Sequence, residues 1–346
     1  MHAFSRWLAL ATVLSGVAAY ADQNDLQISK LGRPDQQVDP NCTSGCAKGN
    51  SQFQSFARAF AASLTSVTLT PPKTTGHAGF NVNGELSVVN LPGTVVIPTT
   101  GAQPSTMLVP SLHVRKGLPF SVELGGRIGW VEKSRMVAAT GEVKWAINEG
   151  STLASHHRSD KGAQPGAPGG KPPPPPDEES PVNEQETGFD TFMRLLPDLS
   201  VRGHVTRLMG VPDFDLTAAG LDLGVGKQFP VGGMVTFTPY GGLDFNFVGA
   251  STGRLYFPPD SSAQPPSDSL TLLKDNTAAY QRMKVADNMT QRIYGGVRFV
   301  GGALQLGAEV SFTRLGTVKL DPTDEASDGR TLPTVVTFNT SIGLDF

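Results

Sequence analysis

The sequence has little of what usually marks a membrane protein. After the first twenty residues, no stretch carries the ~18 or more consecutive apolar residues that a membrane-spanning helix needs. Aromatic residues make up only 8% of the chain, and 28 basic residues stand against 31 acidic ones. Because no excess of basic residues is present, no nucleic-acid partner is expected.

Catalytic motifs are missing as well. The chain has no G-x-S-x-G, no H-E-x-x-H, no P-loop and no G-x-G-x-x-G after a strand. The neighbouring His156 and His157 have no further ligand at metal-binding spacing. We therefore expect no enzyme, no cofactor and no metal site.

Only two cysteines are present, Cys42 and Cys46, four residues apart in "NCTSGC". In an oxidising compartment, such a pair favours a small local disulfide. The alternative, a metal site, needs more ligands than this stretch offers.

The first residues are typical of an export signal. Arg6 precedes an apolar run from Trp7 to Ala19, and an A-x-A pattern ends at Ala21. We therefore expect residues 1–21 to be a signal peptide that is cleaved near Ala21. The alternative is a membrane anchor, but a run of about 13 residues is short of the ~20 that a spanning helix needs.

The next part of the chain is polar and then becomes helical. Residues 22–50 are expected to form a flexible leader that contains the two cysteines. In 51–70, apolar residues recur at i, i+3, i+4 and i+7, namely Phe53, Phe56, Ala57, Phe60, Leu64 and Val67. This predicts an amphipathic helix that ends near Pro71 and packs on the fold, either plugging it or capping it. A membrane-surface helix is the alternative, but Arg58 alone makes a thin basic face.

After Gly79 the apolar period changes from 3.6 residues to 2. In "FSVELGGRIGW", for example, Val122 and Leu124 alternate with Ser121 and Glu123. This alternation predicts ten strands. They cover 80–88, 108–115, 120–130, 137–148, 199–206, 214–226, 235–247, 289–299, 304–313 and 336–346.

The length of these strands decides the fold class. Strands of β-sandwiches usually have 5–6 residues, whereas a tilted membrane-crossing strand needs about 9–11. Most of the predicted strands reach about 10 residues. We therefore expect an all-β fold over 79–346: a monomeric, closed, antiparallel up-and-down transmembrane β-barrel of about 10 strands (8–12). A secreted sandwich is the alternative.

The connections alternate between long and short, as in bacterial outer-membrane barrels. Three of those expected to face outward are long: 90–106, 249–287 and 316–333. The inward ones are short, except for a Pro/Gly-rich insertion at 150–190. That insertion is expected to be disordered, either as a tolerated loop or as a periplasmic tether.

The polar faces of the strands carry charges of both signs. In a narrow barrel these charges should pair with one another and close the lumen, because an unpaired buried charge is costly. A narrow conducting path is the alternative. The expected lumen network consists of Glu85, His113, Arg115, Glu123, Arg127, Glu142, Lys144, Arg202, Asp222, Asp244, Arg292, Arg298, Glu309 and Asp345.

Three aromatic residues are expected at the membrane interfaces. Trp130 and Trp145 lie near opposite ends of neighbouring strands, and Phe346 ends the last strand. Aromatic girdles occupy these positions in membrane barrels.

Several stretches resemble known proteins. The ending "SIGLDF", with a terminal Phe, resembles the C-terminal signal strand of bacterial outer-membrane barrels, which the barrel-assembly machinery recognises. The stretches "PSLHVRKGLPFSVELGG", "GEVKWAINEG" and "LPDLSVRGHVTRLMG" resemble an uncharacterised family of deltaproteobacterial-type outer-membrane barrels. The resemblance covers about 79–346 and implies the barrel fold, the outer membrane, its lipid as a partner, and recognition of Phe346. It implies no activity.

The expected function is structural or one of surface interaction. The outward loops, chiefly 249–287, would meet an unknown extracellular ligand. A porin-like channel for small solutes is the second possibility. An enzyme with groups at the outer rim is the third, but neither His113 nor His204 has a recognisable Ser/Asp partner set in the sequence.

Overall fold

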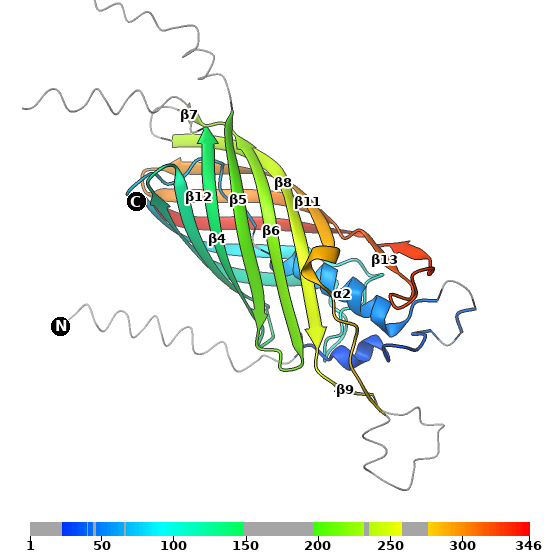
Figure 1. Ribbon diagram of the computed structural model, residues 1–346. Coiled ribbons are helices and arrows are strands. Elements are labelled where there is room, and N and C mark those ends of the chain that lie inside the picture. Colours follow the sequence, from blue (N-terminus) through cyan, green and yellow to red (C-terminus); the bar gives the residue numbers. More distant parts are fainter. Residues whose placement is uncertain are drawn as a thin grey trace, which may run out of the picture.

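A computed structural model describes residues 23–39, 41–43, 46–65, 67–148, 197–231, 235–257 and 276–346. The expected signal peptide and the Pro/Gly-rich insertion lie outside these residues. Figure 1 shows a barrel of tilted strands with a helix and short strands gathered at one end.

Ten long strands form the barrel, and each is antiparallel to its neighbours. β15 pairs with β1 and β8 pairs with β11, so the sheet closes on itself. This confirms the predicted closed antiparallel barrel of ten strands. The strands are β1 (Phe80–Asn90), β2 (Thr106–Leu118), β3 (Val122–Trp130), β4 (Val137–Asn148), β5 (Asp198–Met209), β6 (Phe214–Gly226), β8 (Val235–Thr252), β11 (Met289–Gly301), β12 (Leu304–Arg314) and β15 (Thr334–Asp345).

Short strands lie at the two ends of the barrel. β7 (Phe229–Val231) pairs antiparallel with the start of β8. Two small ribbons, one of β9 (Leu255–Tyr256) with β10 (Thr277–Ala278) and one of β13 (Thr317–Lys319) with β14 (Gly329–Thr331), lie in the long connections.

The barrel has two unlike ends. Phe80 and Phe346 exchange main-chain hydrogen bonds at one end, where Gly302 also makes a short turn between β11 and β12. We call this the turn end. At the opposite end lie the connections 91–105, 131–136, 210–213 and 315–333 and the described parts of 253–288, and we call it the loop end.

Side chains alternate between the two faces of the wall because successive residues of a strand point in opposite directions. In β15, for example, Phe338 and Ile342 are 56% and 60% exposed, whereas the intervening Asn339 and Ser341 are buried. The outer face is therefore apolar and the inner face polar. In a water-soluble protein the distribution is the opposite, with apolar side chains inside and polar ones outside.

A second core lies at the loop end, and it is apolar inside, as the cores of water-soluble proteins are. Residues 23–64 and the loop-end connections pack together there, and we call this assembly the cap. Its core contains Ile28, Leu31, Phe53, Phe56, Phe60, Leu64, Leu91, Ile97, Met136, Phe214, Phe257, Tyr280, Leu315 and Leu332. Within the expected leader, Ile28 and Leu31 are buried in this core.

The helix of the cap, α2 (Gly49–Leu64), lies across the mouth of the barrel (Figure 1). It ends six residues before the predicted end at 70. At Thr65 the chain turns to extended geometry, with ψ 142°, and β-branched residues such as Val67 and Thr68 favour that geometry. Among the described helices, none is long and apolar enough to cross a membrane.

After α2 the chain runs through the barrel from the loop end to the turn end. We call residues 65–79 the thread, of which residue 66 is not described. Leu64 lies in the cap, and Gly79 bonds to Gly117 at the turn end. This passage was not anticipated from the sequence.

Candidate functional site: the filled barrel interior

The wall charges gather inside the barrel. All the residues expected there are buried except Asp345, which is partly exposed at the turn end and pairs with Arg298. The buried ones are Glu85, His113, Arg115, Glu123, Arg127, Glu142, Lys144, Arg202, Asp222, Asp244, Arg292, Arg298 and Glu309.

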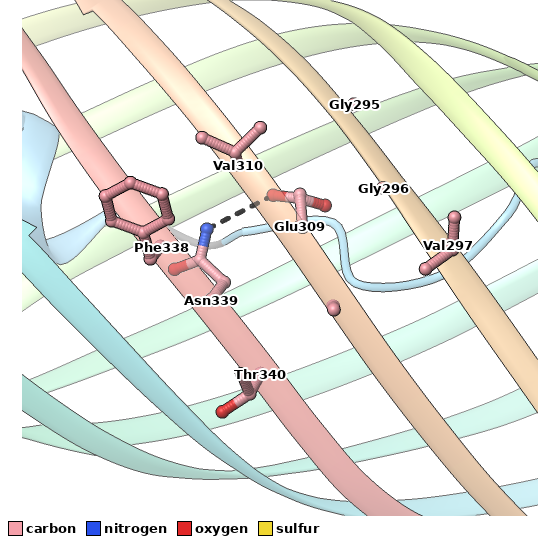
Figure 2. A pocket seen from close by; sticks show the side chains of 9 residues that line it. Gly295, Gly296, Val297, Glu309, Val310, Phe338, Asn339 and Thr340 are labelled. Carbon is pink, nitrogen blue, oxygen red and sulfur yellow. Dashed lines mark hydrogen bonds between the residues drawn. The ribbon is translucent and has the colours of Figure 1, made fainter.

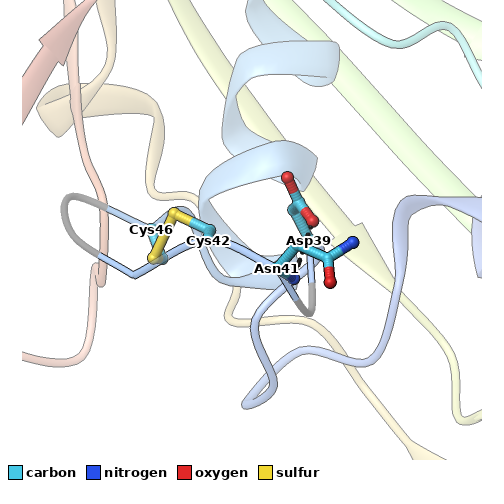
Figure 3. Close-up of a disulfide and its surroundings, with 4 residues drawn as sticks. All are labelled: Asp39, Asn41, Cys42 and Cys46. Carbon is cyan, nitrogen blue, oxygen red and sulfur yellow. Dashed lines mark hydrogen bonds between the residues drawn. A yellow bond between two sulfur atoms is a disulfide. The ribbon is translucent and has the colours of Figure 1, made fainter.

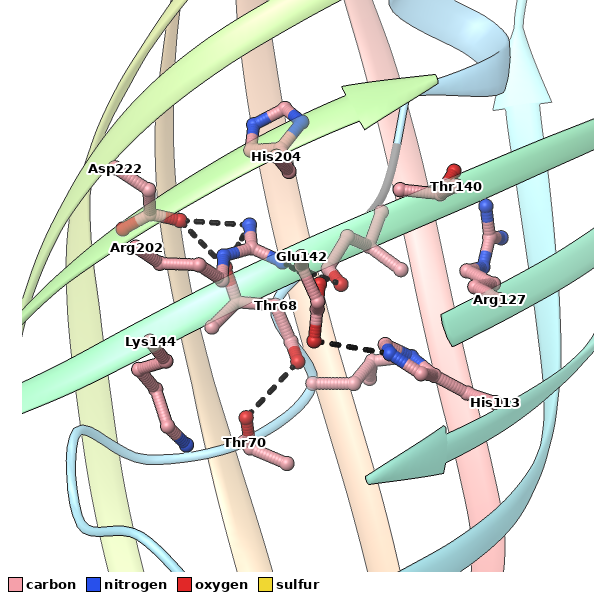
Figure 4. A network of polar contacts seen from close by, with 12 residues as sticks. Thr68, Thr70, His113, Arg127, Thr140, Glu142, Lys144, Arg202, His204 and Asp222 are labelled. Atoms are coloured by element: carbon pink, nitrogen blue, oxygen red, sulfur yellow. Dashed lines mark hydrogen bonds and ion pairs between the residues drawn. The ribbon is translucent and has the colours of Figure 1, made fainter. Parts of the chain in front are cut away.

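The middle of the wall holds a connected chain of charges (Figure 4). The His113 imidazole lies between Glu85 and Glu142, with N–O distances of 2.8 and 3.0 Å. Arg202 extends this row of charges. One of its terminal nitrogens lies 2.8 Å from an oxygen of Glu142, and the other lies 2.8 Å from an oxygen of Asp222. Because neighbouring strands supply these groups in register, each charge has an opposite charge beside it.

Smaller groups complete the wall. Arg127 donates to Glu85 at 2.9 Å, and Lys144 lies 2.8 Å from Glu123. His204 lies 3.1 Å from Asp244, which also faces Arg292 at 3.6 Å.

Glu309 stands apart from the other acids because its partners are largely uncharged. The Tyr240 hydroxyl and the Asn339 amide donate to it, at 3.2 and 3.4 Å. Figure 2 shows the contact between Asn339 and Glu309 on neighbouring strands. The wall is thus densely charged on β2–β6 and richer in amides on β1, β12 and β15, where Asn81 donates to Gln305.

The wall charges also hold the thread, mostly by its main chain. Arg115 donates to the Thr68 carbonyl at 2.9 Å, and Lys144 donates to the Pro71 and Lys73 carbonyls at 3.4 and 3.1 Å. At the loop end, Arg292 donates to the Ala62 carbonyl of α2 at 2.9 Å and also to the Thr65 hydroxyl.

Acidic groups of the wall bind the amide hydrogens of the thread. The Leu69 N–H donates to Glu309 at 2.9 Å, and the Thr75 N–H donates to Glu123 at 2.9 Å. Besides Thr65, the thread contributes the Thr68 side chain to the network, since its hydroxyl donates to Asp222 at 2.9 Å. Both polar groups of an extended chain therefore find charged partners.

Glycines in the wall make room for the thread. A Cβ atom on Gly226 would lie 2.8 Å from Pro72, and one on Gly117 would lie 1.9 Å from the carbonyl oxygen of Gly76. Both are closer than side chains tolerate. These positions therefore need glycine because another segment passes against them.

The thread and the wall together fill the barrel. Leu69 of the thread and His113 of the wall are 0% exposed and Arg115 is 1% exposed, although all three line the interior. Among the described residues, the side chains around Leu69 are therefore shielded from solvent.

The aromatic residues predicted at the membrane interfaces are exposed near the two ends of the barrel. Trp130 is 36% exposed toward the loop end, and Trp145 and Phe346 are exposed at the turn-end half. Cys42 and Cys46 form a disulfide in the leader, beside Asp39 and Asn41 (Figure 3). Among the described residues, no group of three or more His, Cys, Asp or Glu could hold a metal ion.

A shallow depression lies on the outside of β11, β12 and β15 (Figure 2). Gly295 and Ala308 carry little or no side chain there, and Val310 and Phe338 flank them. Its lining also includes the polar residues Glu309, Asn339 and Thr340, of which Thr340 is exposed.

In the cap, one partly exposed ion pair and one buried phenol have shifted pKa values. A hydrogen bond between Lys48 and Asp321 lowers the pKa of the carboxyl and raises that of the amine. Burial raises the pKa of Tyr280, whose hydroxyl donates to the carbonyls of Gly32 and Ile28 at 2.5 and 3.2 Å.

No protein-family model matches the chain, and no curated protein matches it. Solved bacterial barrels align with 78% of it. Neisserial surface protein A matches over 98% of its own length, with 9% identity and a TM-score of 0.27. Ail of Yersinia pestis matches over all of its length (8%, 0.26), as does the beta domain of the Bordetella autotransporter BrkA (12%, 0.32). These TM-scores are low, and the barrel fold is therefore assigned from the strand pairing alone.

Proposed function

We propose that this protein is a bacterial outer-membrane barrel with a closed lumen, which anchors a folded cap at the cell surface. Its role is structural or one of surface interaction, through the cap and the outer loops. The observation that carries the proposal is the buried thread, because a barrel filled by its own chain leaves no path for solutes.

The outer face of the wall supports membrane insertion. Large apolar side chains on the barrel strands are exposed, among them Leu86, Leu112, Ile128, Val143, Leu199, Leu221, Leu243, Ile293, Leu306, Phe338 and Ile342. An apolar surface of this extent is untypical of a soluble monomer. The strands have 9 to 18 residues, enough to cross a bilayer when tilted.

The unlike ends support an orientation. Outer-membrane barrels have short periplasmic turns and long outer loops. The turn end would therefore face the periplasm and the cap would face outward. Membrane lipid is the main partner of the proposed monomer, and the assembly machinery would recognise Phe346. Replacing Phe346 by Ser should then reduce the amount of heat-modifiable barrel in cell membranes.

Conductance tests the closed lumen. The refolded full-length protein, shown to be folded by heat-modifiable migration on gels, should give no single-channel steps in planar bilayers. As a comparison, a variant with Thr68, Leu69 and Thr70 all replaced by Gly loosens the thread and should give brief openings. Stable steps from the native protein would instead favour the narrow channel, and a soluble monomer without detergent would rule out the membrane barrel.

An enzyme at the rim receives less support. His113 and His204 are both buried deep in the interior beside carboxylates, so a substrate at the rim would not reach them. Turnover of ester or peptide substrates by the refolded protein, lost on substitution of either histidine by Gln, would contradict this view.

A further inference from the structure

The cap and the first strand lie on opposite sides of the membrane belt. Residues 23–64 pack at the loop end, whereas Phe80 begins β1 at the turn end. The only connection between them is the thread, which runs inside a ring closed by the pairing of β1 with β15. The first part of the chain is therefore topologically threaded through the barrel.

An exported chain would begin on the periplasmic side, so residues 23–64 must cross the bilayer to reach the outer face. A direct route through hydrocarbon would leave their main-chain polar groups unpaired, at several kcal/mol for each group. The barrel interior is the polar route beside them. Extended, the 15 residues of the thread reach up to ~50 Å, more than the ~30 Å of a bilayer core.

The wall is suited to a passing polypeptide. Arg115 and Lys144 bind carbonyl oxygens of the thread, and Glu123 and Glu309 bind its amide hydrogens. These contacts do not depend on which side chain occupies the position, so other residues can occupy the same track. Between 65 and 72 the thread carries no charged side chain that would need its own partner.

We propose that the barrel interior is a polypeptide conduit through which the chain's own N-terminal segment reaches the outer surface in extended form. Residues 67–75 then stay behind as the closing plug. The substrate of this conduit is an unfolded stretch of polypeptide in cis, and whatever precedes Gln23 in the exported chain travels with it. The inference rests on the proposed outer-membrane location and orientation.

Surface labelling of intact cells tests where the segment ends. One epitope is placed ahead of Gln23, in a second strain at Glu325 in the loop-end connection, and in a third at Gly302 in the turn-end hairpin. The first two should label at least ten-fold more strongly than the third, and all three should label equally after permeabilisation.

The outcomes separate the two proposals. Labelling at Glu325 without labelling ahead of Gln23 would overturn the conduit and leave the outer-membrane barrel standing. Labelling at Gly302 but not at Glu325 would overturn the orientation itself.

The route is tested with a fusion that cannot unfold. A small disulfide-bonded domain is joined ahead of Gln23 in the chain carrying the Glu325 epitope, and its matched control has those cysteines replaced by Ser. The oxidised domain should reach the surface at least ten-fold less than the control, while the Glu325 epitope reports that the barrel has assembled. Equal display of both domains would overturn passage through the lumen.

Discussion

The cap and the middle of the barrel obey opposite rules of burial. In the cap, aromatic and aliphatic side chains such as Phe53 and Phe56 are fully buried, whereas charged ones such as Glu325 face outward. In the barrel, Arg115 and Glu85 are buried, whereas Leu221 and Phe338 face outward. One chain therefore folds against two solvents, water around the cap and, in our proposal, lipid around the wall.

The changeover occurs within single strands. Toward the loop end, inward-facing positions change from polar to apolar, as from Ser87 to Val89 in β1 and from Asn246 to Val248 in β8. At that level the inner wall no longer faces the thread but the cap core. The inner face of a strand is thus polar where it faces the thread and apolar where it faces the cap core. Substitutions can therefore destabilise the barrel interior and the cap core separately.

The largest effect is expected from Arg202→Ala. It leaves Glu142 and Asp222 without their shared arginine in a closed interior, and breaking a buried ion pair costs about 3–5 kcal/mol. Urea unfolding of the refolded barrel should show this loss. Arg207→Ala on the same strand, whose pair with Asp215 is exposed, should cost less than about 1 kcal/mol. Equal losses would refute the difference between inner and outer charges.

Phe53→Ala should disturb the cap and spare the barrel. Phe53 is fully buried and stacks on Tyr280 with ring centroids 4.7 Å apart, and such truncations cost about 3–5 kcal/mol. Limited proteolysis should cut the cap faster, while heat-modifiable migration of the barrel stays unchanged. The matched change Phe338→Ala, on the outer wall, should leave cap proteolysis as in the native protein.

Leu221→Arg tests the lipid-facing side. Leu221 lies near the middle of β6 and is 48% exposed, and an arginine at the bilayer midplane costs about 2–4 kcal/mol. Unfolding in lipid vesicles measures this cost. The control Glu325→Arg lies on the cap and should change stability by less than about 0.5 kcal/mol. No loss from Leu221→Arg would show that this surface faces water.

The smallest effect concerns pH and the cap. Since the pKa of Asp321 is lowered in the folded state, its pair with Lys48 stabilises the cap above pH ~4 and is lost as the pH falls through the folded value. The pKa of Tyr280 is raised, so its contribution holds below pH ~10 and is lost at higher pH.

Thermal melting of the cap, followed by near-UV circular dichroism, should therefore fall at both limits. Asp321→Asn should flatten the acid limb and also, through the loss of the raised Lys48 pKa, part of the alkaline limb, whereas Tyr280→Phe should flatten the alkaline limb only. An acid limb unchanged by Asp321→Asn would contradict the assignment to this pair.

The strands could be read from the sequence because their period of 2 is a local property. The same period placed residues such as His113 and Arg127 on the inner face, and antiparallel register then brought them together. The thread could not be read in this way. Its segment, "TSVTLTPPKTTG", has no charge before Lys73 and alternates only briefly, at Val67 and Leu69, before two prolines end the pattern. Its partners come from distant strands. A local signal for the cap did exist, since the apolar residues Val89, Met107 and Val335 continue the inner face just beyond the ends of the predicted strands.

The sequence by itself determined the wall: ten strands, their two faces and the charges on the inner one, because alternation and strand length are set residue by residue. Only the tertiary structure decided what those charges bind. Hydrogen bonds between Arg115 and Thr68, or between Glu309 and Leu69, join residues far apart in the chain, and they form only once the closed barrel surrounds the thread. The cap likewise exists only because the thread carries α2 to the loop end, where five connections supply the rest of its core.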